Sequence, residues 1–444
     1  MKNSYFFLLI ISLFYSCEND NNQLFSPDNI ESQFFQINIA TDTTIQAKDG
    51  TVLEIDKNTF SSKSGSVKLE VKEVLTKSDI IKSGLFTLAE NNEILESDGM
   101  LFLDVEPKQE PLKSIKVKMP TSALNPDMQL FELGEDNLWK NPQPLLESPE
   151  SKRIVSGQNL YNSYCASCHS KDLREDMTGP ALGNVHLFRT EEWLRDFTLN
   201  SYQMIANLDS MSICIWNNWK PTAMTTFEGI LSEKEISDIY FFIKNESRLQ
   251  KIEKNEVEYV IECDITYRGN PDDPNGGDWG IRSIDAKTNQ GRKISHSNSS
   301  NGFGFTPFPQ TFTDTLQNEF STGNFGWMNV DYFLRKNEIS TEEVDAFKVK
   351  INGKNIDAKF KVLVVFRKRN IVIPLNSSSS VTKIYTIFGK EKINMPKGEK
   401  IYLVAIGNDY SFGIKQATIG DKNSFELTLK PSSQKKISKF IKSL

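Results

Sequence analysis

The chain has 444 residues, of which 38% are hydrophobic and 25% are charged. This composition is ordinary for globular protein, and at about 100–200 residues per domain the length predicts roughly two to four domains. The formal net charge of −6 is small for such a length and argues against nucleic-acid binding, which needs a concentrated basic face.

Residues 1–17 predict an export signal that ends in a cysteine. Lys2 gives a short positive start, and the apolar run at 5–15 is too short to cross a bilayer as a permanent helix. The run leads into Leu-Phe-Tyr-Ser-Cys and resembles a bacterial lipoprotein signal, which implies a lipidated Cys17 and a membrane anchor. A plain secretory signal with an incidental cysteine is the alternative. We expect a lipid-anchored protein of the cell envelope, at the outer membrane, on its periplasmic or its surface face.

The next segments predict a linker at 18–30 and a β-sandwich at 31–148. Short runs of alternating apolar and polar residues, as in 67–72 and 115–119, are separated by turn residues. Period-two alternation indicates half-buried antiparallel strands. Residues 50–60 resemble the opening of ZU5-like sandwiches in exported proteins of Bacteroidetes.

The pattern becomes helical over 153–250, where Cys165, Cys168 and His169 form a Cys-x-x-Cys-His motif. Two thiols three positions apart at a helix end can reach two vinyl groups on one porphyrin edge, and the next residue directs an imidazole at the iron. This spacing is the attachment signature of c-type haem, and imidazole is a usual axial ligand. The motif predicts one covalent haem c, bound through both cysteines, with His169 on the iron. Such attachment takes place outside the cytoplasm, in agreement with the export signal.

Two other interpretations of Cys-x-x-Cys fit the chain less well. A thioredoxin-like dithiol needs a βαβ setting, which the flanking helical pattern does not offer. A zinc site needs two further ligands at matching spacing. The remaining candidates are not paired in the sequence: His186, Cys214, Cys263 and His296.

The surrounding sequence resembles class I monohaem cytochromes c. Residues 178–182 are similar to the Gly-Pro-x-Leu loop that lies along the proximal haem face in that family. Residues 193–197 are similar to the middle helix over the haem edge, and 224–236 to the segment from the ligand loop into the last helix.

The resemblance assigns further residues to the haem. Pro180 falls on the proximal face, Met224 on the sixth ligand and Phe227 on the aromatic ring packed beside it. Thr225 stands where many members of the family have proline, so the resemblance does not carry over the rigidity of their loop. A thioether gives the iron a higher potential than a second imidazole does. His186 is the alternative sixth ligand, and an open position or another methionine is a further one.

The last helix of this segment is predicted from its own residues. Ser232 and Glu235 form a capping box at its start. One apolar stripe follows: Ile236, Ile239, Tyr240 and Ile243. In the family this helix crosses the first one, which implies a close backbone approach with Gly157 opposite Tyr240.

Strand-like runs return over 256–444, which we predict to be a β-rich region of one or two domains. Residues 324–333 resemble a segment that follows ZU5-like domains in such lipoproteins. We expect a multidomain chain in which a small all-α cytochrome c domain is inserted between β-sandwich-like, mainly antiparallel domains. For Cys214 and Cys263 we expect two buried free thiols, with a disulfide in an oxidising compartment as the alternative.

These features predict a membrane-anchored monohaem cytochrome that carries one electron at a time between redox partner proteins of the cell envelope. With both axial positions filled, no substrate need bind the iron, and the sequence offers no hydrolytic triad or phosphate loop that would support an enzyme. One alternative is a haem enzyme or sensor, in which Met224 leaves and the iron binds peroxide or a gas. Another is a surface binding module whose β domains hold a polymer or protein while the haem connects it to a respiratory chain.

Overall fold

The computed structural model describes residues 25–219, 224–268, 280–296, 316–334, 341–352, 360–377, 384–387 and 391–444. Cys17 and the predicted signal therefore lie outside the described residues. Among the residues described, no helix combines the length and the apolar character that crossing a bilayer requires.

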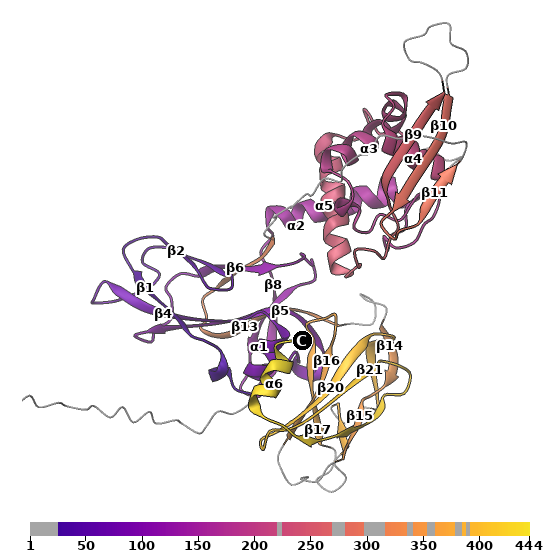
Figure 1. The fold of residues 1–444 in the computed structure, drawn as a ribbon. Helices are drawn as coiled ribbons and strands as arrows, with labels where there is room; N and C mark the ends of the chain where they lie inside the picture. Colours follow the sequence, from indigo (N-terminus) through magenta and orange to yellow (C-terminus); the bar gives the residue numbers. More distant parts are fainter. Residues whose placement is uncertain are drawn as a thin grey trace, which may run out of the picture.

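Two antiparallel sheets near the start of the chain pack face to face (Figure 1). The six-stranded sheet has the spatial order β1 (Gln33–Asn38), β4 (Ser66–Val74), β5 (Leu95–Glu106), β13 (Gly326–Phe333), β7 (Gln129–Leu133) and β8 (Trp139–Pro144). The four-stranded sheet has the order β12 (Leu316–Thr322), β6 (Ile115–Thr121), β3 (Val52–Ile55) and β2 (Thr43–Gln46). Alternate residues of β4, such as Leu69 and Val71, share one core with Leu53 and Val117 of the second sheet. The alternation in the sequence thus builds a β-sandwich, called here the host sandwich.

Strands that follow the helical segment in the chain complete both sheets of the host sandwich. β13 pairs with β5 and β7, and β12 pairs with β6. At the junction, the backbone N–H of Leu146 donates to the carbonyl of Glu319 at 2.8 Å. The chain therefore leaves the host sandwich beside the point at which it returns. The region predicted over 256–444 is therefore divided in the structure. Its strands lie in the host sandwich, in the C-terminal sheets and in a small sheet beside the helical segment.

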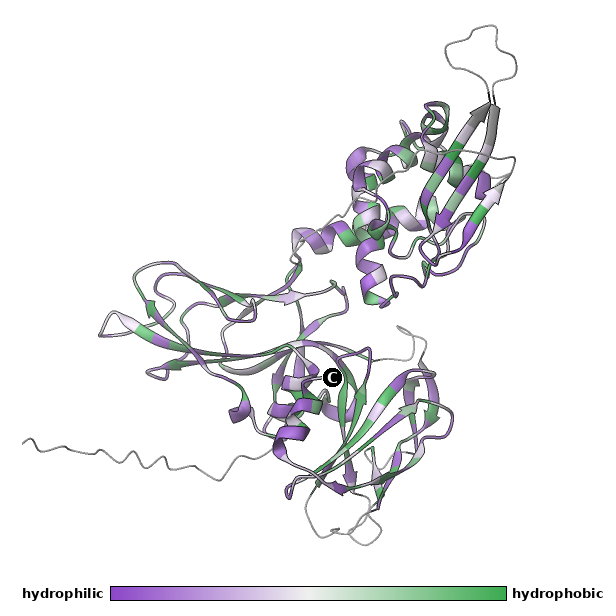
Figure 2. Cartoon of the chain, viewed as in Figure 1, coloured by the Kyte–Doolittle hydropathy of each residue, from purple (hydrophilic) through white to green (hydrophobic). Residues whose placement is uncertain are grey.

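An eight-stranded sheet contains most of the C-terminal strands. Its order is β22 (Ser424–Thr428), β15 (Lys348–Asn352), β18 (Ile384–Thr386), β17 (Val372–Ser377), β16 (Phe360–Phe366), β20 (Lys400–Gly407), β21 (Ser411–Thr418) and β23 (Lys430–Pro431); β14 (Thr341–Asp345) pairs with β19 (Lys392–Pro396). Both faces of β16 are buried, because Val364 belongs to one core and Val365 to another. A strand covered on both faces needs a continuous apolar run, and Figure 2 shows the central strands largely green.

The second of these cores joins the eight-stranded sheet to the host sandwich. It contains Trp139 of β8, Val365 of β16 and Ile437 of the C-terminal helix α6 (Gln434–Ile441). The short helix α1 (Lys77–Ser83) and the turn η2 (Glu90–Asn92) lie in the same part of the chain. Residues 25–30, which belong to the predicted linker, hold the turn η1 (Pro27–Asn29) and place Ile30 in this core.

The helical segment forms a separate unit, called here the helical unit (residues 149–249). Its elements are α2 (Pro149–Leu160), the π-helical turn η3 (Tyr161–Cys165), the turn η4 (Val185–Leu187), α3 (Glu191–Ala206), α4 (Ser210–Asn218) and α5 (Glu233–Leu249). A three-stranded sheet in the order β11 (Lys293–His296), β10 (Gly280–Thr288), β9 (Val260–Arg268) packs on α4, away from the host sandwich (Figure 1). The structure therefore has several domains, mainly antiparallel sheets and one helical unit.

The expectation of two free thiols at Cys214 and Cys263 is wrong. The two residues form a disulfide with a Cα–Cα distance of 6.4 Å. The reason is that α4 packs along β9, and Ile213, Val260 and both cysteines lie in one small apolar cluster.

Candidate functional site

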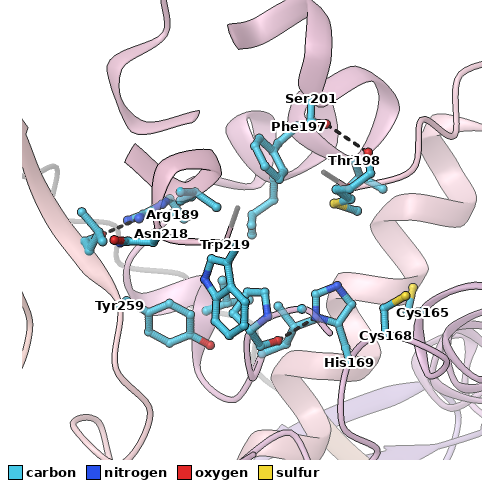
Figure 3. Close-up of a pocket in the computed structure, with 18 of the residues that line it drawn as sticks. Cys165, Cys168, His169, Arg189, Phe197, Thr198, Ser201, Asn218, Trp219 and Tyr259 are labelled. Atoms are coloured by element: carbon cyan, nitrogen blue, oxygen red, sulfur yellow. Dashed lines mark hydrogen bonds between the residues drawn. The ribbon is translucent and has the colours of Figure 1, made fainter. Parts of the chain in front are cut away.

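The Cys-x-x-Cys-His motif follows α2 and begins at Cys165, the last residue of η3. The side chain of Ser148 accepts the N–H of Ser151 at 3.0 Å, and Pro149 occupies the first helical turn, so the helix begins where its sequence favours a cap. After η3, the backbone N–H groups of Cys168 and His169 both donate to the carbonyl of Cys165, at 3.0 and 2.9 Å. This tight turn places Cys165, Cys168 and His169 at one end of a cavity (Figure 3).

Neither cysteine of the motif takes part in a disulfide. Cys165 is buried and Cys168 is exposed. Burial raises the pKa of the Cys165 thiol to about 12, and the neighbouring Cys168 adds to that shift. A thiol that stays protonated at neutral pH is a poor nucleophile, whereas reactive dithiols depend on a lowered pKa. The environment of Cys165 therefore gives no support to the thioredoxin-like interpretation.

His169 is held from behind by the loop at 178–182. Its Nδ1 lies 2.7 Å from the carbonyl of Pro180. Because a carbonyl only accepts hydrogen bonds, Nδ1 must donate, and the lone pair of Nε2 is left free. Burial lowers the pKa of His169, although the bond to Pro180 opposes this shift, and the neutral ring is the form that binds a metal.

Gly179 lies directly against the His169 ring. A Cβ at this position would lie 2.7 Å from Cε1 and 3.1 Å from Nε2 of the imidazole. The N–H of Gly179 also donates to the carbonyl of Cys168 at 2.8 Å. Glycine is therefore required for the loop to approach the ring, and the Gly-Pro pair has a local physical reason.

The cavity beside the motif has a volume of about 520 Å³. All six residues assigned to the haem from the sequence line it: Cys165, Cys168, His169, Pro180, Met224 and Phe227. Figure 3 shows the motif at one end and Arg189 and Asn218 at the other. The structure thus brings together assigned residues as far apart in the sequence as Cys165 and Phe227, as a folded site requires.

The loop that carries Met224 is hydrogen-bonded to α3 at the point where that helix is interrupted. Asn200 has φ −153° and ψ 80°, which breaks the helix, and the carbonyl of Leu199 accepts the N–H groups of Phe227 and Glu228, each at 3.0 Å. The hydroxyl of Ser201 donates to the carbonyl of Met224 at 3.3 Å. The carbonyl and hydroxyl groups of α3 therefore fix the start of this loop beside the cavity.

His186, the alternative sixth ligand, is not among the residues that line the cavity. It lies in η4, and its Nδ1 is buried without a hydrogen-bond partner. Burial lowers the pKa of His186 to about 4, and the charges of Lys244 and Arg248 add to that effect. Of the two candidate ligands, Met224 is the one placed at the cavity.

The last helix is built as the sequence predicts, apart from one contact. The Ser232 and Glu235 side chains form the capping box. A Cβ at Gly157 would lie only 2.0 Å from the carbonyl oxygen of Asp238, so α2 and α5 do approach closely. The prediction that Gly157 lies opposite Tyr240 is wrong, because α5 turns that side toward α3, where the Tyr240 hydroxyl lies 2.7 Å from the hydroxyl of Thr198.

A family model described as Cytochrome c matches residues 154–247, from α2 to α5. The chain contains a cytochrome c domain. Its cofactor is covalently bound haem c, and a domain of this family implies haem-based electron transfer.

Comparison with solved structures gives two similar chains, both of an engineered cytochrome c from Rhodothermus marinus, Rma TDE, one of them bound to a carbene intermediate. Identity is 24% for that complex and 25% for the other structure. Each match covers 23% of this chain and 85% of the other, with a TM-score of 0.20. No curated protein matches the chain.

The far end of the cavity suits the acidic edge of haem c. Arg189 lines the cavity, and its Nε is buried without a hydrogen-bond partner. Burial lowers the pKa of Arg189 to about 10, so the guanidinium stays charged at neutral pH. When the vinyl edge of the porphyrin is fixed at the cysteines, its two propionates lie at the opposite edge, and the Arg189 guanidinium lines that end of the cavity. The residues present therefore fit haem at both ends.

Arg189 and Tyr259 are residues that the sequence did not single out. Arg189 is one basic residue between an apolar run and the helix cap at Thr190, and its burial is visible only in the fold. Tyr259 lies outside the segment matched by the cytochrome family, so no motif points to it. Its closeness to the haem cavity depends on how β9 packs.

Proposed function

We propose that the protein is a membrane-anchored monohaem c-type cytochrome that acts as a one-electron relay in the cell envelope. The observation that carries this proposal is the arrangement of one cavity. The motif cysteines and His169 lie at one end of it, Met224 also lines it, and the free Nε2 of His169 results from the bond between Nδ1 and Pro180.

The chain's residues favour electron transfer over catalysis at the iron. Haem c supplies an iron that exchanges one electron between its ferrous and ferric forms. His169 and Met224 would fill both axial positions, and the loop that bears Met224 is fixed by Leu199 and Ser201 of α3. A fixed coordination sphere leaves no open position for a substrate. The alternative of a peroxide- or gas-reactive enzyme or sensor requires Met224 to leave.

The proposal is tested by producing the full chain in cells that have a haem-maturation system. A pyridine haemochrome spectrum of the thioether type, and a protein mass raised by one haem, are expected. A colourless protein without that added mass would overturn the proposal.

The axial role of Met224 is tested by Met224→Ala. We expect loss of the sulfur-to-iron absorption band in the red, binding of carbon monoxide to the reduced protein, and a potential lower by roughly 0.1–0.3 V, part of the ~0.8 V range that axial ligands span. Met177→Ala is the matched control, because Met177 is 52% exposed. A wild-type protein that already binds carbon monoxide readily would favour the enzyme or sensor.

The anchor and location follow from the N-terminal sequence. The signal-like segment that ends at Cys17 supports a lipid anchor at the outer membrane, on the periplasmic or surface face, with redox proteins of the envelope as partners. Metabolic labelling with a fatty acid is expected to mark the wild type and not Cys17→Ala. Recovery of the label in Cys17→Ala would show that the acyl chain is attached elsewhere.

We also infer that the helical unit is an insertion in a β-rich host. The hydrogen bond between Leu146 and Glu319 places the two ends of the excursion side by side, which is the geometry at which domain insertion is tolerated. The host sandwich, with its ZU5-like opening sequence, would then hold the haem near its partners or a surface ligand.

A further inference from the structure

The strand β9 lies beyond the end of the cytochrome-family segment, yet it contacts three different walls of the haem cavity. Tyr259, which directly precedes β9, contacts the loop behind His169. Val260 contacts Arg189, and Cys263 is bonded to α4. These three contacts come from the short stretch of residues 259–263.

Tyr259 reaches the His169 side of the cavity. Its hydroxyl lies 2.8 Å from the carbonyl of Ala181 and 3.1 Å from that of Gly183, so its single proton is shared between two acceptors. Ala181 directly follows Pro180, whose carbonyl holds the His169 ring. Tyr259 is 8% exposed, and loss of a buried hydrogen bond would leave these carbonyls without their donor. Tyr259 is therefore a positioning residue for His169.

Val260 contacts Arg189 at the charged end of the cavity. Its carbonyl accepts a hydrogen bond from the guanidinium of Arg189, and the carbonyl of Phe188 accepts a second at 2.6 Å. These two bonds use terminal nitrogens of Arg189 and leave its Nε without a partner. β9 thus fixes the guanidinium at the wall of the cavity together with Phe188 and Met211.

The disulfide of Cys263 ties β9 to the helix that precedes Met224 in the chain. Its disulfide partner Cys214 lies on α4, and Trp216 and Trp219, which follow on the same segment, line the cavity. Met224 lies inside the loop of sequence separation 49 that the disulfide closes. Because the cross-link opposes separation of α4 from β9, it restricts movement of the cavity wall that carries Trp216 and Trp219, from which the chain runs on to Met224.

We propose that the sheet β9–β11 is a clasp on the haem cavity, in which Tyr259 holds the His169 side and the Cys214–Cys263 disulfide holds the Met224 side. This inference rests on the proposed function, since it takes Met224 as the sixth ligand. Without the clasp, Met224 would leave the iron more often, and small ligands would then reach it.

The disulfide arm compares the wild type with the double variant Cys214→Ser/Cys263→Ser, both as the full haem-loaded chain. The readout is the rate at which carbon monoxide binds to the reduced protein. We expect a rate higher by at least about tenfold, a fraction of what closing a loop of this size contributes. We also expect the red sulfur-to-iron band of the oxidised variant to fade at a lower temperature. Equal rates and equal band stability would overturn the disulfide's part in the clasp.

A second measurement covers the case in which the double variant fails to fold. Folded wild type is treated with a phosphine reductant to open the disulfide, and carbon monoxide binding is compared with that of wild type reduced by dithionite alone. The same increase in rate is expected, and no increase would overturn the proposal.

The tyrosine arm uses Tyr259→Phe with Tyr202→Phe as its matched control, because Tyr202 is 55% exposed on α3. Proton NMR of the oxidised protein reports the orientation of the axial ring through the haem methyl shifts. We expect Tyr259→Phe to move these shifts and Tyr202→Phe to leave them unchanged. Unchanged shifts in Tyr259→Phe would remove the His169 side of the clasp. A wild type that lacks the red band and binds carbon monoxide freely would overturn both the clasp and the sixth ligand, whereas a normal wild type with unchanged variants would overturn the clasp alone.

Discussion

The ring of His169, the proposed axial ligand, is held by two residues of one loop, Gly179 and Pro180. The Nδ1–H of His169 donates to the carbonyl of Pro180 at 2.7 Å. Gly179 has no side chain and so leaves room for the ring beside the backbone. The ring therefore needs no rearrangement to present Nε2. Such pre-positioning matters for electron transfer, because a ligand that does not move between oxidation states adds little to the barrier.

The first prediction concerns Gly179→Ala. The new Cβ would lie within 2.7–3.1 Å of three atoms of the imidazole, so the ring or the loop must shift. We expect the haem protein to lose about 1–3 kcal/mol of stability, as is typical of overpacking, and its red band to move or weaken. Thermal unfolding followed in the haem absorption measures both effects. Gly323→Ala is the control, since no atom lies within 4 Å of the added Cβ there, and equal stability of the two variants would contradict the prediction.

At the scale of elements, the site depends on the crossing of α2 and α5. α2 leads through η3 into the Cys-x-x-Cys-His motif, and α5 meets α2 at Asp238 and Phe242 while Ile239 and Ile243 of its buried stripe line the cavity. The crossing is close because Gly157 has no side chain to separate the backbones. The position of the cysteines therefore depends on a glycine two helical turns before them.

The second prediction is Gly157→Ala. In an ordinary helix interior this change stabilises by about 1 kcal/mol, because alanine has the higher helix propensity. Here the added Cβ would meet the Asp238 carbonyl at 2.0 Å, so the sign reverses and we expect a loss of about 1–3 kcal/mol or more. Urea unfolding followed at the haem band measures it. Gln158→Ala, at an exposed neighbouring position, should be neutral, and a stabilised Gly157→Ala would show that the helices can separate without cost.

These elements also show where sequence reasoning stops. The motif at Cys165–His169, the capping box at Ser232 and the alternating strand β4 are local patterns, whose physical reasons act within a few residues. The pairing of β13 with β5 joins segments far apart in the chain, as the hydrogen bond between Ser97 and Asn329 at a separation of 232 illustrates. The alternating pattern of these strands is compatible with many pairing registers, and the shared core selects one of them. The Cys214–Cys263 bond likewise depended on how α4 meets β9.

At the scale of the whole molecule, a small buried junction joins the helical unit to the β-rich parts. One carboxylate oxygen of Glu96 on β5 lies 2.5 Å from Nζ of Lys251, which follows α5. The other oxygen lies 2.7 Å from a terminal guanidinium nitrogen of Arg369, between β16 and β17. The Tyr332 hydroxyl of β13 donates to the same carboxylate at 2.6 Å. One carboxylate therefore bonds to residues of three structural parts.

A second contact fixes the same unit. The side-chain amide of Asn245 on α5 accepts the N–H of Leu124 and donates to its carbonyl, both at 2.8 Å and both buried. Lys368 pairs with Glu253 at 2.9 Å nearby. These bonds fix the orientation of the haem cavity relative to the host sandwich. A fixed orientation suits the proposed relay, because it would keep the distance to its partners constant.

The third prediction is that Glu96→Gln loosens this junction. Burial alone would raise the pKa of Glu96, but the charges of Lys251 and Arg369 outweigh it and hold that pKa below its usual value. Removing the charge of Glu96 takes the ion-pair partner from Lys251 and leaves Arg369 with Glu399 alone, so we expect a loss of about 3 kcal/mol of unfolding free energy at pH 7. Glu106→Gln, which breaks an exposed pair with Lys68, should change little and serves as the control.

The pH dependence of that loss identifies its cause. Because the folded pKa of Glu96 is lowered, its ionised form stabilises the native state fully above the unfolded pKa of about 4.3, and this stability disappears as the pH falls through the folded pKa. The difference between wild type and Glu96→Gln should therefore be constant from pH 7 to about pH 5 and shrink below it. Hydrogen exchange of α5 and β5, measured across this range, should show faster opening in the variant at pH 7 and similar opening at the acid end. A difference that stayed the same at low pH would mean that shape, and not charge, joins the helical unit to its host.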